Sequence, residues 1–387
     1  MNALVPETQG REPNRRWLQF SLRSLLLFVL MVSIACSWFA VRLRKAEKQK
    51  AAVAAFEKAG GFVRYDFDPG DPSDPFYRSR RLDLDPPYPA WLVKQLGIDF
   101  FADATGAVYF PWELTVMNCS GPPPPLPPNF DFDILTRLPR LQALTVFIRD
   151  SGDFEKIARL VQIGHLNIIA NGYGDENLAH LRALVRLRSI SLFGFTIQSG
   201  LQHLAALLQL SEMRLSACRF ASSDMVPAVR LGQIEELDFD RTYDVNVALT
   251  WVKDSPRLRR LRISHGDMSE DCELKQAGME IIVSLPHLEE LELSRLVIEE
   301  TAISQLGKMR QLRRLAIPYS KIHDADLKQL QDLKQLEQLD LSYNPINGEG
   351  LDHLKGLPRL RSLIFFGPIT DLQAQKLCTL CRSGKRV

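Results

Sequence analysis

The chain has 387 residues, of which 45% are hydrophobic and 24% charged, as in globular proteins and unlike disordered ones. Its 48 basic residues nearly balance 46 acidic ones, and the net charge of +2 provides no bulk attraction toward nucleic acid. The six cysteines lack the spacing of a disulfide framework, which excludes a disulfide-rich scaffold.

The first 42 residues predict a membrane anchor. Residues 1–16 are polar, with prolines and arginines, and we expect a disordered basic tail. The 17 positions from Leu25 to Val41 carry no charge, and a bilayer span needs about 17–25 apolar residues. We predict a transmembrane helix over residues 17–42, with Leu25 to Val41 facing the lipid bilayer. A cleaved signal peptide is the alternative, but the run is longer than a usual signal core and no small-x-small cleavage site follows it.

Basic side chains flank this span on both sides. Four arginines precede Leu25 and five lysines or arginines follow Val41, so the positive-inside count is nearly balanced. The short tail favours a cytoplasmic N-terminus, and the cluster after the span favours the reverse. We expect a single-pass membrane protein with its N-terminus inside and its C-terminal domain outside the cytoplasm.

Residues 43–61 predict a helical stalk, because they lack proline, are rich in strong helix formers and end in two glycines. The segment 62–67 alternates like a strand, and 89–101 predicts a short amphipathic helix. That helix carries Trp91, Leu92 and Leu96 on one face. We assign residues 62–131, which include a proline-rich loop, to an N-terminal cap over the first edge of the repeat array described below.

Two registers are open for the first repeat-like strand, one through Leu114–Cys119 and one through Val108–Phe110. The run PPPPLPP at 122–128 follows. It fits a polyproline ligand for an aromatic groove, or a stiff loop that replaces one convex helix. We favour the loop, because the apolar spacing resumes at Phe132.

A unit of 24 residues, 336–359, defines the remaining chain. Leu336, Leu339 and Leu341 are the three anchors of a short strand, and later leucines recur at every third position, as in a helix or 3₁₀-helix. The same anchors recur at Leu141/Leu144/Val146, Ile163/Leu166/Ile168, Leu187/Ile190/Leu192, Leu210/Met213/Leu215, Ile234/Leu237/Phe239, Leu258/Leu261/Ile263, Leu288/Leu291/Leu293, Leu312/Leu315/Ile317 and Leu360/Leu363/Phe365. Successive first anchors lie 22 to 30 residues apart, with a step of 30 where the loop Ser269 to Gln276 is inserted.

The stretch Leu336 to Asn344 matches L-x-x-L-x-L-x-x-N, and residues 132–387 therefore resemble the leucine-rich repeat family. The resemblance implies an α/β solenoid with parallel strands on the concave face, helices on the convex face, and binding rather than catalysis. It also implies that the asparagine position turns inward to cap backbone groups. That position holds Asn171, Cys218, Thr242, Ser320 and Asn344, but Phe195 and Leu296 break the polar ladder. The anchored layout is similar to single-pass leucine-rich repeat proteins of planctomycete-type bacteria.

Residues between the anchors face the concave side, where equivalent positions in successive strands form rows. Three rows alternate in charge: Glu235, Arg259, Glu289, Arg313, Glu337 and Arg361; Glu236, Arg260, Glu290 and Arg314; Asp238, Arg262 and Glu292. They are either a docking surface or a self-satisfied ladder that sets stacking register, and we favour the ladder. Asp240 is the least compensated, because its row neighbours are serines.

The position after the third anchor carries Phe147, Ile169 and Phe193 in successive repeats, which predicts an exposed apolar contact patch unless the cap covers it. The predicted partner site on the concave face is therefore Phe147, Ile169, Phe193, Asp238, Asp240 and Arg262. Its partner is an unknown protein or envelope polymer, and we expect no nucleic acid.

Catalytic motifs are absent, and the seven histidines lack metal-ligand spacing. We therefore assign no catalytic, cofactor or metal residues and predict a non-catalytic interaction or scaffold module. The alternative is a thiol–disulfide active envelope protein that uses Cys378 and Cys381, the only C-x-x-C pair.

Overall fold

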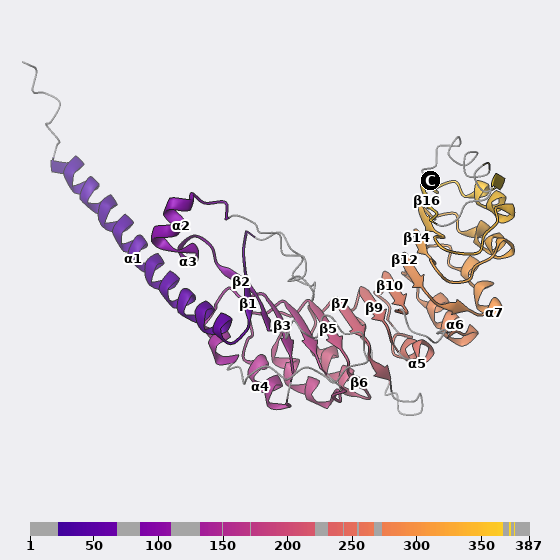
Figure 1. Ribbon diagram of the computed structural model, residues 1–387, viewed down its shortest axis with the longest axis horizontal. Helices are drawn as coiled ribbons and strands as arrows, with labels where there is room; N and C mark the ends of the chain where they lie inside the picture. The colour runs from indigo at the N-terminus through magenta and orange to yellow at the C-terminus, as the bar shows by residue number, and fades with distance from the viewer. Residues whose placement is uncertain are drawn as a thin grey trace, which may run out of the picture.

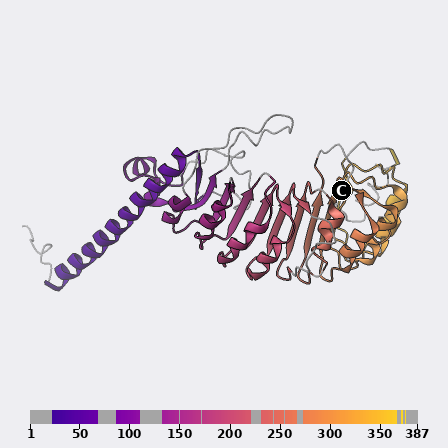
Figure 2. The ribbon, with the colours of Figure 1, turned by 90° about the horizontal axis from the view of Figure 1, so that it is seen from below.

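A computed structural model describes residues 22–67, 86–109 and 132–366, with gaps at 149, 171, 221–230, 243, 254 and 267–272, together with 371, 372 and 375. The molecule is a curved solenoid from which one long helix projects at the N-terminal end (Figure 1). A single sheet follows the concave side from end to end, and short helices follow the convex side (Figure 2). The predicted α/β solenoid is confirmed.

The solenoid sheet contains one strand per repeat. These strands are β3 (Ala143–Phe147), β4 (His165–Ile169), β5 (Ser189–Phe193), β7 (Glu212–Ser216), β9 (Glu236–Asp240), β10 (Arg260–Ser264), β12 (Glu290–Ser294), β14 (Arg314–Ala316), β15 (Gln338–Asp340) and β16 (Ser362–Ile364). Each is parallel to the next, and equivalent anchors pair, as Leu261 does with Leu291. Every anchor is buried except the half-buried Phe365, so the predicted repeat register is confirmed.

The convex side is built mainly from 3₁₀-helices. The segments are η4 (Phe132–Arg137), α4 (Gly152–Ala158), η5 (Glu176–Ala183), η6 (Gly200–Ala206), α5 (Val245–Thr250), α6 (Gln276–Ser284), α7 (Glu300–Ile303), η8 (Leu306–Lys308), η9 (Asp324–Asp332) and η10 (Glu349–Gly356). In a 3₁₀-helix, residues three apart lie above one another, so leucines at every third position share one buried face. The two-stranded sheets β6 (Thr196–Ile197) with β8 (Arg219–Phe220), and β11 (Glu273–Leu274) with β13 (Val297–Ile298), link neighbouring repeats.

Inward-turned polar side chains cap the backbone where the repeats turn. The Asn344 amide nitrogen donates to the Ile317 carbonyl at 2.7 Å, and its oxygen accepts from the backbone N–H of Ser320 at 2.9 Å. Ser320 Oγ donates to the Leu293 carbonyl at 2.8 Å, and Thr242 does the same to Leu215 at 3.3 Å. The repeat polar groups thereby satisfy backbone atoms that would otherwise be buried unpaired.

The series of inward polar side chains is interrupted at the two repeats where the sequence predicts it. Phe195 and Leu296 are buried apolar residues at the equivalent position, and Phe195 packs edge-to-face on Phe154 at 6.4 Å. Cys218 is also buried there, with its thiol 3.5 Å from the Leu192 carbonyl. The predicted contribution of Asn171 lies outside the described residues.

The N-terminal helix α1 (Leu22–Lys58) is continuous over 37 residues. By length and composition its first half is apolar enough to cross a membrane, a property that signal sequences share, and that half is exposed. The predicted stalk is the second half of the same helix, which ends before Gly60 in the left-handed region at φ 89°. There Ala52, Val53 and Phe56 are buried against the rest of the chain.

Two strands extend the sheet beyond the first repeat. The strand β1 (Phe62–Tyr65) is antiparallel to β2 (Ala104–Tyr109), which is parallel to β3. The short helices α2 (Ala90–Leu96) and α3 (Ile98–Phe101) connect toward β2. In β2 the inward residues are Ala107 and Tyr109, which pair with Leu144 and Val146. The register through Val108 and Phe110 is thus wrong by one residue, and 114–119 and 122–128 lie outside the described residues.

Candidate functional site: the concave groove

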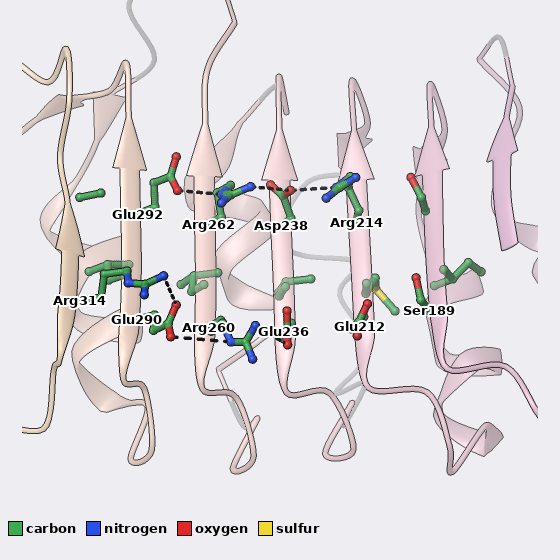
Figure 3. Close-up of a pocket in the computed structure, with 17 residues that line it drawn as sticks. Ser189, Glu212, Arg214, Glu236, Asp238, Arg260, Arg262, Glu290, Glu292 and Arg314 are labelled. Carbon is green, nitrogen blue, oxygen red and sulfur yellow. Dashed lines mark hydrogen bonds and ion pairs between the residues drawn. The ribbon is translucent and has the colours of Figure 1, made fainter. Parts of the chain in front are cut away.

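The centre of the concave face is hollowed over strands β5 to β14. Two hollows of about 260 Å³ and about 310 Å³ lie over these strands, and five residues line both: Ser191, Arg214, Asp238, Arg262 and Glu292. Because anchors point into the core, the residues between them project from consecutive strands into this groove (Figure 3). The sequence pattern thus determines which side chains a partner can meet.

The upper row of Figure 3 is a continuous chain of opposite charges. Arg214 Nε lies 2.9 Å from Asp238 Oδ2, and Arg262 lies 4.0 Å from the same oxygen. Arg262 Nε is 2.8 Å from Glu292 Oε2. Burial raises the pKa of Asp238, and the two neighbouring arginines oppose this shift. The second Asp238 oxygen, Oδ1, is buried without a hydrogen-bond partner among the described residues.

The lower row alternates over four strands and then breaks. Arg260 lies 2.7 Å from Glu236 and 4.0 Å from Glu290, and Arg314 lies 3.3 Å from Glu290. Toward the N-terminus, however, Glu236 pairs in register with Glu212 (Figure 3). Burial is the largest cause that raises the pKa of Glu236, and the Glu212 carboxylate adds to it.

Glu212 is the functional candidate that sequence reasoning missed. Glu212 lies two residues after the anchor Leu210, so the repeat template places it in the same row as Glu236, although the predicted row begins at Glu236. Like charges opposite one another on adjacent strands are destabilising. The pair therefore marks the place in this row where the ladder leaves negative charge uncompensated.

The third predicted row also forms ion pairs. Arg259 Nη1 is 2.5 Å from Glu289, which also lies 3.8 Å from Arg313, and Arg313 is 3.4 Å from Glu337. All of these groups are substantially solvent-exposed, so each pair contributes little on its own. The alternation supports the ladder interpretation, because opposite charges do meet across the strands.

The predicted apolar patch is less exposed than expected. Phe147 and Ile169 retain only 7% and 8% exposure, so the expectation of an exposed patch is wrong for these two residues. The strand register places Ile169 between Phe147 and Phe193, so the three side chains cover one another on the sheet. Phe193 is half-buried, with the Arg241 guanidinium 5.5 Å from its ring centre.

Asp240 is better compensated than its row neighbours indicated. It accepts a hydrogen bond from Ser264 Oγ at 3.0 Å and lies 3.2 Å from Arg241 Nε. Arg241 adopts the left-handed backbone region at φ 48°, outside the strand pattern from which the row was predicted. The structure therefore brings Asp238, Asp240 and Arg262 to one groove wall, which Ile169 and Phe193 also line, whereas Phe147 lies outside both hollows.

The described residues contain no group of three or more His, Cys, Asp or Glu side chains placed to hold a metal ion. Burial raises the pKa of the Cys218 thiol to about 12, which suits a packing role rather than a reactive one. Cys378 and Cys381 lie outside the described residues, so the thiol alternative stays a prediction.

One family model and several solved structures match parts of this chain. A family model described as "Leucine rich repeat" matches residues 310–367. No curated protein matches the chain. Similar solved structures include an internalin (InlF) of Listeria monocytogenes, at 17% identity and TM-score 0.38. The match covers 64% of this chain and 80% of the internalin chain. Internalin C2 of the same organism matches at 19% identity and TM-score 0.36, covering 56% and 84%.

A TLR13–ssRNA13 complex matches at 17% identity and TM-score 0.44, covering 62% of this chain and 38% of that one. The family model, the regular anchors and the parallel sheet with its inward polar ladder all identify the same repeat. The described part of the chain therefore forms a leucine-rich repeat solenoid, of which residues 310–367 match the family model.

Proposed function

We propose that this chain is a single-pass, membrane-anchored and non-catalytic interaction module that holds a protein partner in the groove over β5 to β14. The observation that carries the proposal is the charge pattern of that groove. Four arginines and five carboxylates line the hollow of about 260 Å³, and ion pairs join most of them to one another. A polyanion therefore gains no net attraction there, which favours a protein over nucleic acid.

The negative charge that the groove leaves unpaired indicates which chemical groups a partner would present. Glu212 and Glu236 face each other, and the buried Asp238 Oδ1 accepts no hydrogen bond among the described residues. A lysine or arginine of a partner would relieve the repulsion and supply the missing donors. The groove is thus suited to a basic side chain presented by a protein surface.

Membrane attachment is supported by packing at the end of the apolar run. The rings of Phe39 and Phe100 lie 5.1 Å apart, so cleavage after this run as a signal peptide would remove a contact with the cap. An uncleaved anchor keeps this packing. We place the N-terminus inside and the repeats outside the cytoplasm, as the short N-terminal tail favours.

Two exposed glutamines allow a matched test. Gln338 lies on concave strand β15, whereas Gln331 lies on the convex helix η9. With a photo-crosslinking amino acid at either site in native membranes, we expect a discrete protein adduct from position 338 and none from 331. The adduct should weaken in Glu212→Lys, because a partner's basic group would then be repelled. Adducts from 331 alone, or equal adducts from both, would refute the assignment of the concave face.

A further inference from the structure

The helix α2 is amphipathic in sequence, yet none of its residues is buried. Trp91 remains 63% exposed, and Leu92 and Leu96 are only half-buried. A surface helix normally packs its apolar stripe against the protein core. Seven residues are also too few for a helix that is stable on its own. The described residues therefore supply no full partner for the apolar face of α2.

The position of α2 identifies such a partner. Its neighbour α3 packs directly on α1: the rings of Phe39 and Phe100 lie 5.1 Å apart, and Arg42 Nε donates to the Phe100 carbonyl at 2.8 Å. Phe39 belongs to the uncharged run that ends at Val41. The contact between the cap and α1 thus begins within the last turn of the apolar run, and Figure 1 shows α2 and α3 beside the middle of α1.

This attachment fixes the height of the cap along α1. Farther along the same face, Lys45 lies 3.0 Å from Asp103, and Gln49 donates to Asp99 at 3.0 Å. Contacts at 39, 42, 45/46, 49, 53 and 56 follow the spacing of one helix face, so the cap cannot slide or pivot without losing several of them.

The length of the apolar run then places α3 at the membrane surface. At about 1.5 Å per residue, Leu25 to Val41 is roughly 25 Å long, slightly less than the roughly 30 Å hydrocarbon layer. A span this short holds Phe39 at the edge of the hydrocarbon. The attached α3, and α2 beside it, must lie at the level of the lipid headgroups.

The side chains of this region suit that level. Tryptophan favours the membrane–water interface, and Trp91 on the cap and Trp38 on α1 are both exposed. Lys94 on α2 and Arg44 on α1 are also exposed, as basic groups near lipid phosphates usually are. We infer that α2 is a membrane-surface contact, with Trp91 and Leu92 inserted into the interface of the same bilayer that α1 crosses. This inference rests on the proposed anchoring by α1.

Lipid quenching of tryptophan fluorescence tests the inference on the full chain. Five tryptophans are present, so the contribution of each is the difference between the wild type and a single Trp→Phe variant. The vesicles contain phosphatidylcholine and phosphatidylglycerol with a doxyl group near the headgroup end of the acyl chain. Trp38→Phe reports the anchor, and Trp251→Phe reports a tryptophan that is 3% exposed inside the solenoid.

We expect the Trp91 contribution to be quenched several-fold more than that of Trp251, and to a degree comparable with Trp38. Quenching of Trp38 without Trp91 would overturn the surface contact and leave the anchor intact. If neither is quenched, the proposed anchoring fails as well. Because Trp91 is largely exposed to the protein's surroundings, Trp91→Phe should fold normally, and circular dichroism would verify this.

Discussion

Reversing one charge in the groove measures what the ladder contributes. Arg262 lies between Asp238 and Glu292, at 4.0 and 2.8 Å. Arg262→Glu removes two attractions and creates two repulsions, each worth about 0.2–1 kcal/mol across strands. Because the Arg262 side chain is more than half exposed, water screens these terms, and we expect a loss of about 1–2 kcal/mol in the free energy of unfolding.

Urea unfolding at low and high salt separates this electrostatic loss from a packing defect. The Debye length shrinks to about 3 Å in 1 M salt, so the deficit of Arg262→Glu should diminish there. Arg257→Glu is the matched control, because Arg257 is exposed in the turn before β10, outside the rows. It should change stability by less than about 0.5 kcal/mol. An equal loss in the two variants, or a loss unaffected by salt, would show that the rows do not stabilise the stack.

Three further outcomes are expected. Leu339→Ala removes a side chain buried between Leu315 and Leu363 and should cost about 2–5 kcal/mol in urea unfolding, whereas the exposed His353→Ala should cost less than about 0.5 kcal/mol; similar losses would contradict the register. Burial raises the folded-state pKa of Glu236, so its protonation should increase the free energy of unfolding of the wild type as pH falls from 7 through that pKa. Glu236→Gln should lack this increase, and parallel pH profiles of stability for the two proteins would contradict the prediction. Full-length protein should stay in membranes through carbonate washing, and its release would refute the anchor.

Periodicity predicted the solenoid because the same contact recurs in every repeat. Each anchor meets its equivalents in the strands on either side, as Leu315 meets Leu291 and Leu339. Ten repetitions of one spacing leave little freedom for another register. Of the two registers left open for the first strand, the one through Val108 and Phe110 is wrong at β2. Ala107 and Tyr109 occupy the anchor positions there, and neither resembles the leucines of the template.

The sequence predicts which residues form the candidate site, but it does not predict how exposed their side chains are. Alternation shows which face a side chain occupies, but its cover depends on the size of its neighbours. Phe147 and Ile169 lie on the predicted face and are nevertheless buried. The partner of Asp240 is Arg241, the next residue in the chain, whose positive φ no row pattern encodes.

The sequence also predicts in part that α1 packs against the cap. The apolar positions Phe39, Ala46, Val53 and Phe56 share one helical face, but they overlap with the membrane span and the basic stalk. Composition therefore predicted a helix without indicating that the cap packs along it. Composition does not indicate where α3 lies. In the structure its carbonyls accept hydrogen bonds from the Arg42 side chain.

A rigidly attached solenoid limits where a partner can be. Asp238 lies on β9, five strands from β2, or roughly 24 Å along the sheet at about 4.8 Å per strand. If the cap lies at the lipid surface, as we infer, the groove stays within one protein diameter of the proposed anchor. Its charges are largely paired with one another, so long-range attraction contributes little and recognition depends on short-range fit at Glu212 and Glu236. A partner held at the same membrane gains effective concentration, and a modest intrinsic affinity is then sufficient for stable association.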